Sequence, residues 1–154
     1  MEPMATLLSR HAGPGRVGWI GIRPVRLALV QAVGAALLTD RGLEGDHASG
    51  GLRAVTLMQA EHLPVIAALA HSSPVAPETL RRNILVSGLN LSALRGAVLT
   101  LGEAQVRLTG PCAPCSRMEG ALGPGGYNAM RGHGGWCAEV VRTGRIAVGD
   151  VVTA

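Results

Sequence analysis

The chain has 154 residues, of which 47% are hydrophobic and 16% are charged, a composition typical of one ordered domain with a substantial core. The basic residues behind its net charge of +4 are 14 arginines, because lysine is absent. Without a lysine amine the chain cannot form an internal Schiff base with pyridoxal phosphate. Its few aromatic residues and scattered positive charges argue against a nucleic-acid-binding protein.

The first half of the chain predicts mostly strands. We expect residues 1–14 to be a loose leader and residues 15–154 to form the domain. The hydrophobic pattern then gives, in order, a strand over 15–22, one or two buried strands over 25–38 interrupted at Gly34, a polar glycine-rich loop over 39–52 and a strand over 53–58.

The second half predicts one longer helix and further short strands. Apolar residues at helical spacing indicate a helix over 59–70. The remaining elements are a short helix that begins at Pro77, a strand over 83–87, a hairpin of 97–101 with 104–109, and a second hairpin of 136–142 with 145–148. Short strands at regular spacing with a few short helices predict a mainly β fold, a β-barrel.

The sequence also carries signals on cellular location. It has no apolar run of about 18 residues, which a membrane-spanning helix needs. Its first residues lack the basic and apolar regions of a signal peptide. Together with an odd number of cysteines, three, these features predict a protein of the reducing cytoplasm with no membrane partner.

The most informative motif is the run GPCAPCSRME, which holds Cys112 and Cys115. Each cysteine follows a proline, and the pair lies between a predicted strand and a glycine-rich loop that ends at Gly135. A thiol on a rigid turn beside cationic side chains is suited to thiolate chemistry or metal ligation. We expect Arg117 and Arg131 to favour the thiolate form of Cys115.

The same cysteines allow a structural alternative. Cys112 and Cys115, with His133 and Cys137, have a spacing compatible with a tetrahedral zinc site. A non-catalytic binding module stabilised by zinc is therefore an alternative interpretation of the sequence.

Several other residues are suited to an anionic ligand. His47 and Arg53 accompany the glycine-rich loop GLEGDH, in which backbone amides can approach an anion. Arg81 and Asn83 would point to the same side if they lay on a strand, with Arg82 pointing away. Arg131 adds a cation near the cysteines, and His133 adds a group that titrates near neutral pH.

Taken in order, these segments resemble the MOSC domain, which is named for the C-terminal domain of molybdenum cofactor sulfurases. The matching segments are GLEGDH, RAVTL, LRRNILVSGLNLSALRG, LGEAQVRLTGPCAPCSRME and RGHGGWCAEVVRTGRIAVGD. The resemblance covers roughly residues 15–153, and it implies a MOSC-type β-barrel that binds molybdenum cofactor or handles its sulfur.

By motif position, the resemblance implies that the thiolate of Cys115 is the metal ligand. It places the family's cofactor contacts on Arg81 and Asn83. His47, Arg53, Arg131 and Cys112 are further expected cofactor-binding residues, and His133 is the candidate proton donor.

Two activities follow as expectations for a stand-alone domain of this family. The first is reduction of N-hydroxylated substrates with electrons from a separate reductase. The second is sulfur transfer, in which Cys115 accepts sulfur from a donor protein as a persulfide and hands it on. Full desulfurase activity is not expected, because that reaction depends on a pyridoxal-phosphate domain.

Overall fold

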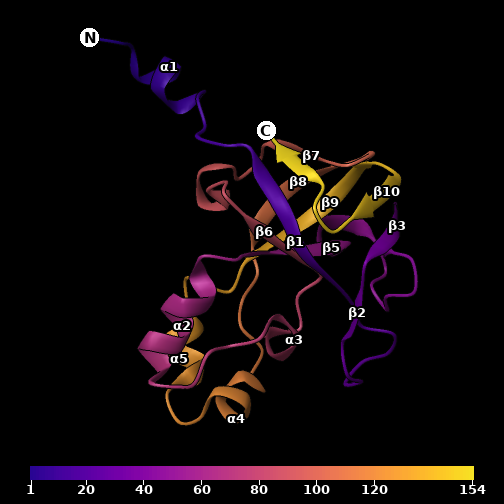
Figure 1. The fold of residues 1–154 in the computed structure, drawn as a ribbon, viewed down its shortest axis with the longest axis vertical. Helices are drawn as coiled ribbons and strands as arrows, with labels where there is room; N and C mark the ends of the chain where they lie inside the picture. The colour runs from indigo at the N-terminus through magenta and orange to yellow at the C-terminus, as the bar shows by residue number, and fades with distance from the viewer.

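The computed structural model describes residues 1–154, and its centre is a closed barrel of seven strands in the order β11-β7-β8-β9-β5-β6-β1 (Figure 1). All neighbouring strands are antiparallel except β5 and β6, which are parallel. The strands are β1 (Gly15–Ile22), β2 (Gln31–Val33), β3 (Ala35–Thr39), β4 (Gly42–Leu43), β5 (Val55–Gln59), β6 (Ile84–Ser87), β7 (Val98–Leu101), β8 (Ala104–Pro111), β9 (Trp136–Arg142), β10 (Gly144–Ala147) and β11 (Val151–Thr153).

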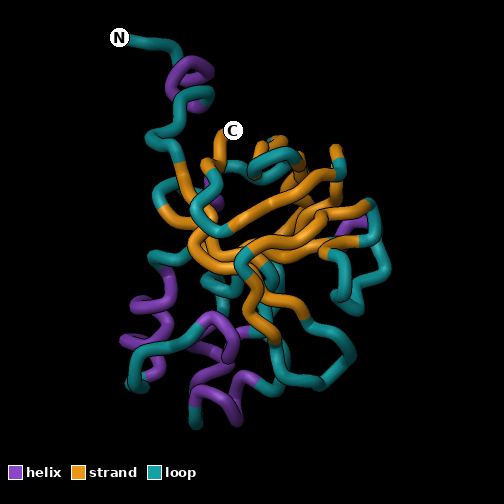
Figure 2. Tube along the Cα trace, turned by 45° about the vertical axis from the view of Figure 1, so that its right-hand side comes forward, coloured by secondary structure: helices purple, strands orange, loops and turns teal.

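Short helices occupy the connections between the strands. They are α1 (Met4–Leu8), α2 (His62–Ala70), α3 (Pro77–Leu80), α4 (Met118–Leu122) and α5 (Gly126–Met130), with single 3-10 turns at Gly51–Arg53 and Leu91–Ala93. Helices α2 to α5 gather at one end of the barrel, whereas α1 projects from the opposite end (Figures 1 and 2). None of these helices is long and apolar enough to cross a bilayer.

The main core fills the barrel because alternate residues of each strand point inward. In β8 the inward set is Ala104, Val106 and Leu108, all fully buried, while Arg107 between them is exposed. A second, smaller core lies among the helices and is rich in methionine: it comprises Met58, Ile66, Leu80, Met118, Leu122 and Met130. The cysteine-bearing loop runs from the barrel into this helical end.

The structure confirms the predicted mainly β barrel and most of its strands. It corrects the segment over 25–38, because residues 25–30 form a loop in which Leu29 is 88% exposed. The predicted break at Gly34 is present, between β2 and β3.

The second predicted hairpin is wrong in its pairing. Strand β10 does not pair with β9; it pairs with β3, and β3 pairs with β4 in a separate three-stranded sheet. The sharp Thr143-Gly144 turn therefore sends the chain from the barrel wall to another sheet.

Candidate functional site

Cys112 and Cys115 lie in the turn between β8 and α4, yet they line different pockets. Cys115 is exposed and lines a pocket of about 350 Å³. Cys112 is half-buried and lines a separate pocket of about 250 Å³ together with Cys137. The two thiols of the motif thus have distinct surroundings.

The Cys115 pocket is strongly cationic. It is lined by His47, the Cys115 thiol and five arginines, which are Arg23, Arg26, Arg81, Arg82 and Arg117. No aspartate or glutamate lines it. The backbone amide of Arg117 donates a hydrogen bond to the Cys115 sulfur, with an N–S distance of 3.4 Å. This donor set offers one soft ligand and several anion-binding groups at one opening.

One wall of this pocket is held by an ion pair. Arg23 contacts Asp46 with a distance of 3.0 Å between Nη2 and Oδ2, and the Asp46 side chain is fully buried. Burial by itself raises the pKa of Asp46, but the hydrogen bonds and charge of Arg23 outweigh it, so that this pKa lies below its usual range. Arg23 is therefore fixed in direction by a carboxylate that stays ionised.

Asn83 connects this pair to the barrel and is itself only 1% exposed. Its Nδ2 donates to the carbonyl of Gly21 (3.0 Å) and to Asp46 Oδ1 (3.1 Å). Its Oδ1 accepts from the backbone amide of Thr56 (3.1 Å) and from Arg23 (3.4 Å). The amide group is therefore fully engaged within the protein, where it positions Arg23 and Asp46.

Arg81 and Arg82 are placed differently from the strand-based prediction, because β6 begins only at Ile84. Arg81 has a left-handed backbone, with φ of 56°, and its guanidinium donates to the carbonyl of Ala28. Burial, followed by the nearby charges of Arg117 and Arg23, lowers the pKa of Arg81. Such crowding of like charges marks a place where a bound anion would be stabilised.

Arg82 is buried, and it lines the same pocket as Arg81 instead of pointing away from it. Its Nε donates to the carbonyl of Gly134 at 2.7 Å, and its Nη2 donates to that of Ala113 at 3.1 Å. These bonds tie the cysteine turn to the glycine-rich loop before β9. Residue types alone could not identify this role, because both acceptors are backbone carbonyls distant in sequence.

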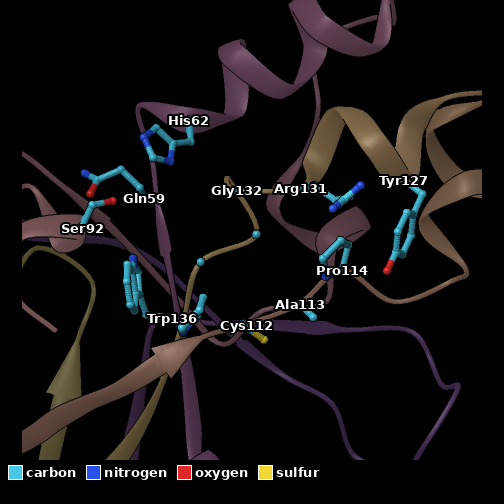
Figure 3. Close-up of a pocket in the computed structure, with 13 residues that line it drawn as sticks. Gln59, His62, Ser92, Cys112, Ala113, Pro114, Tyr127, Arg131, Gly132 and Trp136 are labelled. Atoms are coloured by element: carbon cyan, nitrogen blue, oxygen red, sulfur yellow. The ribbon is translucent and has the colours of Figure 1, made fainter. Parts of the chain in front are cut away.

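The remaining predicted residues do not lie at the Cys115 pocket. Arg53 lines the pocket of Cys112 and Cys137. Arg131 lines a third pocket, of about 240 Å³, whose floor includes Cys112 (Figure 3). In that view Arg131 and Tyr127 come from the helical side, and Trp136 and Gln59 face them across the opening. The sequence groups these residues, but the fold distributes them over three openings.

His133 is also placed away from Cys115. Its ring packs edge-on against His62, with ring centroids 5.2 Å apart. The Nδ1 atom of His133 is buried without a hydrogen-bond partner. Burial and the neighbouring His133 lower the pKa of His62. The two imidazoles thus form a pair between α2 and the loop after α5.

The predicted zinc ligands do not come together. Cys112 and Cys137 are neighbours, but Cys115 opens into another pocket and His133 faces His62. No group of three or more potential histidine, cysteine or carboxylate ligands is assembled anywhere in the chain. The structure gives no support to the four-residue zinc site.

Comparisons with known proteins point to one family. The model of the MOSC domain matches residues 44–153. The YuaD protein from Bacillus subtilis has 18% sequence identity and a TM-score of 0.79, over 91% of this chain and 94% of that chain. YiiM from Escherichia coli has 24% identity and a TM-score of 0.69, over 89% and 68%.

A second YiiM, from Geobacillus stearothermophilus, has 19% identity and a TM-score of 0.74 over 91% of this chain and 74% of that chain. At these identities the three structures show a shared fold. No functionally curated protein matches the sequence.

Proposed function

Because this chain belongs to the MOSC domain family, we propose that it binds molybdenum cofactor in the arginine-lined pocket around Cys115. The observation that carries this proposal is the meeting of one exposed thiol with five arginines in a single opening. A metal held by a pterin dithiolene, with a phosphate tail, needs a soft ligand and a cationic cradle. Both are present, so the residues fit the group.

The roles of the residues follow from their positions. Cys115 would be the metal ligand, while Arg26, Arg81 and Arg117 would bind the anionic part of the cofactor. Asp46 and Asn83 would hold Arg23 in its orientation and would make no contact with the ligand themselves. Arg53, Arg131 and Cys112 line other openings and would make no contact with the metal.

The reaction we propose is reduction of an N-hydroxylated substrate with electrons from a separate reductase. When bound, the cofactor would supply a metal centre that changes oxidation state. His47 lines the pocket and can hold a proton for a leaving oxygen, whereas His133 lies against His62. The cationic lining would exclude cations and favour anionic or polar substrates.

Sulfur transfer is the alternative activity of the same pocket. The exposed thiol of Cys115 could accept a sulfane sulfur as a persulfide, and the surrounding arginines would stabilise its negative charge. This activity requires a metal-free pocket, so metal content separates the two possibilities.

The test is the molybdenum and pterin content of the protein purified from a host that synthesises the cofactor. Molybdenum with pterin in the wild type, and neither in Cys115→Ser, is the expected result. Cys112→Ser is the matched thiol control and should keep both. Arg117→Gln should lower the content, and Arg41→Gln, which removes an exposed arginine outside the pocket, should not.

Wild-type protein without molybdenum would overturn cofactor binding. Detection of a persulfide on Cys115 in that protein, by mass spectrometry, would then support sulfur transfer.

A further inference from the structure

A second pair of thiols lies apart from Cys115. The barrel ladder pairs Gly110 of β8 with Cys137 of β9, and the Cys112 amide donates to the Gly135 carbonyl at 2.8 Å. Residues 112 and 137 are therefore diagonal neighbours on one face of the ladder. Both line the same pocket of about 250 Å³. Cys137 is only 7% exposed, whereas Cys112 is half-buried.

The charge around this pair is positive. Arg23, Arg53 and Thr56 line the pocket, and no carboxylate does. Arg23 is neutralised by Asp46, but Arg53 forms no ion pair. Arg82, whose guanidinium reaches the neighbouring Ala113 carbonyl, likewise has no carboxylate partner. A small anion would therefore be attracted to the thiols.

The two thiols differ in character. The pKa of Cys112 is lowered to about 6, first by a hydrogen bond from the Cys137 thiol and then, against the effect of burial, by Arg82, Arg23 and Arg53. The same hydrogen bond, with burial, raises the pKa of Cys137. Of the two sulfurs, Cys112 thus carries negative charge more readily and is within reach of solvent, whereas Cys137 is buried.

We propose that Cys112 and Cys137 form a thiol–disulfide exchange site for small anionic disulfides, in which Cys112 attacks and Cys137 resolves. This site opens through another pocket than Cys115, although Arg23 lines both, and it does not depend on cofactor binding. Arg53 would attract the substrate, and the burial of Cys137 ensures that an incoming disulfide meets Cys112 first.

The exchange balances in two steps. The Cys112 thiolate attacks one sulfur of the substrate, whose S–S bond breaks and releases one half as a thiolate. In the mixed disulfide Cys112 carries no charge, so Cys137 no longer faces a neighbouring thiolate; it loses its proton, and its thiolate attacks the Cys112 sulfur. The second half of the substrate departs as a thiolate and takes up a proton. The substrate is reduced to two thiols, and the protein holds a Cys112–Cys137 disulfide that an external dithiol returns to the reduced state.

The experiment uses metal-free, reduced protein carrying Cys115→Ser, so that the exposed third thiol does not react. The probe is dithiobis(nitrobenzoate), a disulfide with two carboxylates. Two equivalents of nitrothiobenzoate per chain are expected, and intact mass should show an internal disulfide with no adduct. Adding Cys137→Ser should stop the reaction at one equivalent with a stable mixed disulfide, and dithiothreitol should restore both thiols in the parent protein.

A second experiment tests whether the site prefers anionic disulfides. Arg53→Gln should slow the reaction with dithiobis(nitrobenzoate) on the order of tenfold at low ionic strength. It should slow the reaction with neutral dithiodipyridine much less, because there Arg53 acts only through its small effect on the Cys112 thiolate. Circular dichroism of each variant checks that the fold is kept.

Three results would overturn the proposal. The first is a stable mixed disulfide on Cys112 although Cys137 is present. The second is equally fast reaction of a Cys112→Ser variant through Cys137. The third is an equal effect of Arg53→Gln on the charged and the neutral probe, which would remove the preference for anions.

Discussion

Three polar side chains decide how the Cys115 pocket is built. Asn83 uses its carboxamide to fix both members of the Arg23–Asp46 pair, in which Asp46 is fully buried and Arg23 reaches the pocket. A buried ion pair contributes little by itself, but removing one member leaves an uncompensated charge. The network therefore makes the direction of Arg23 a property of the folded barrel, so that a ligand need not impose it.

Asp46→Ala is expected to destabilise the protein by about 1–3 kcal/mol at pH 7, because the mostly buried Arg23 and Asn83 would lose a charged hydrogen-bond partner. The folded-state pKa of Asp46 is depressed, so the stability that it contributes is present above its unfolded pKa of about 3.9. That contribution is lost as the pH falls through the lower folded-state value. Urea unfolding of both proteins at neutral pH and at about pH 3 measures the difference.

Glu139→Ala is the matched control for that measurement. Glu139 forms an ion pair of similar length with Arg107, 2.9 Å, but both side chains are partly exposed. Its removal should cost at most about 1 kcal/mol. Equal losses in the two variants would show that burial of the Arg23–Asp46 pair has no special weight.

At this scale the sequence predicts residue types better than positions. The proline-flanked motif rightly directs attention to Cys112 and Cys115, but it treats them as one centre. The zinc alternative groups Cys112 with Cys137, 25 positions further along the chain, but only the strand register shows that these two are neighbours without Cys115 and His133. Arg23 carries no motif at all, and its role depends on a contact with Asp46 across two loops.

The arrangement of β8 and β9 explains why the turn that holds Cys112 and Cys115 lines more than one pocket. Strand β8 delivers the cysteine turn to the edge of the barrel, and the glycine-rich loop before β9 runs beside it. The sequence predicts β8 well because its apolar residues alternate, and it predicts β9 because aromatic and β-branched residues favour a strand. It misses α4 and α5, since each has only five residues and they are stabilised mainly by the methionine-rich second core.

Gly135 controls the close approach of that loop to the barrel. Its φ is 90°, and an added Cβ would overlap the Leu57 carbonyl oxygen of β5. Gly132 also has a positive φ, of 83°, but a Cβ there would meet open space. Comparing the two glycines thus distinguishes the effect of a positive φ, which both have, from the effect of a steric contact, which only Gly135 has.

Both Gly135→Ala and Gly132→Ala should suffer backbone strain on the order of 1–2 kcal/mol. Gly135→Ala should lose about 1–3 kcal/mol more, because the loop must move off β5. Urea unfolding gives both values, and the rate of Cys112 alkylation reports whether the cysteine turn has shifted. Identical stabilities would mean that the approach to Leu57 is not a constraint.

On the scale of the whole molecule, closure of the barrel depends on the last strand, β11. β11 pairs with β7 on one side and with β1 on the other, so three residues join the two ends of the barrel sheet. Val152 points into the core and is fully buried. The sequence indicates a barrel from its many short strands, but it cannot reveal which strands join, since β11 is too short for a periodic pattern. For the same reason the transfer of β10 to another sheet could not be foreseen.

The two ends of the chain should therefore differ sharply in their effect on stability. Val152→Ala removes two buried methyl groups and should cost roughly 2 kcal/mol, at about 0.8 kcal/mol for each group plus a cavity. Removal of residues 2–8 should leave the melting temperature unchanged, because α1 buries no side chain. Calorimetry of both variants measures the contrast. A loss of stability on removing α1 as large as that of Val152→Ala would show that the leader is part of the domain, and it would contradict a domain that begins at Gly15.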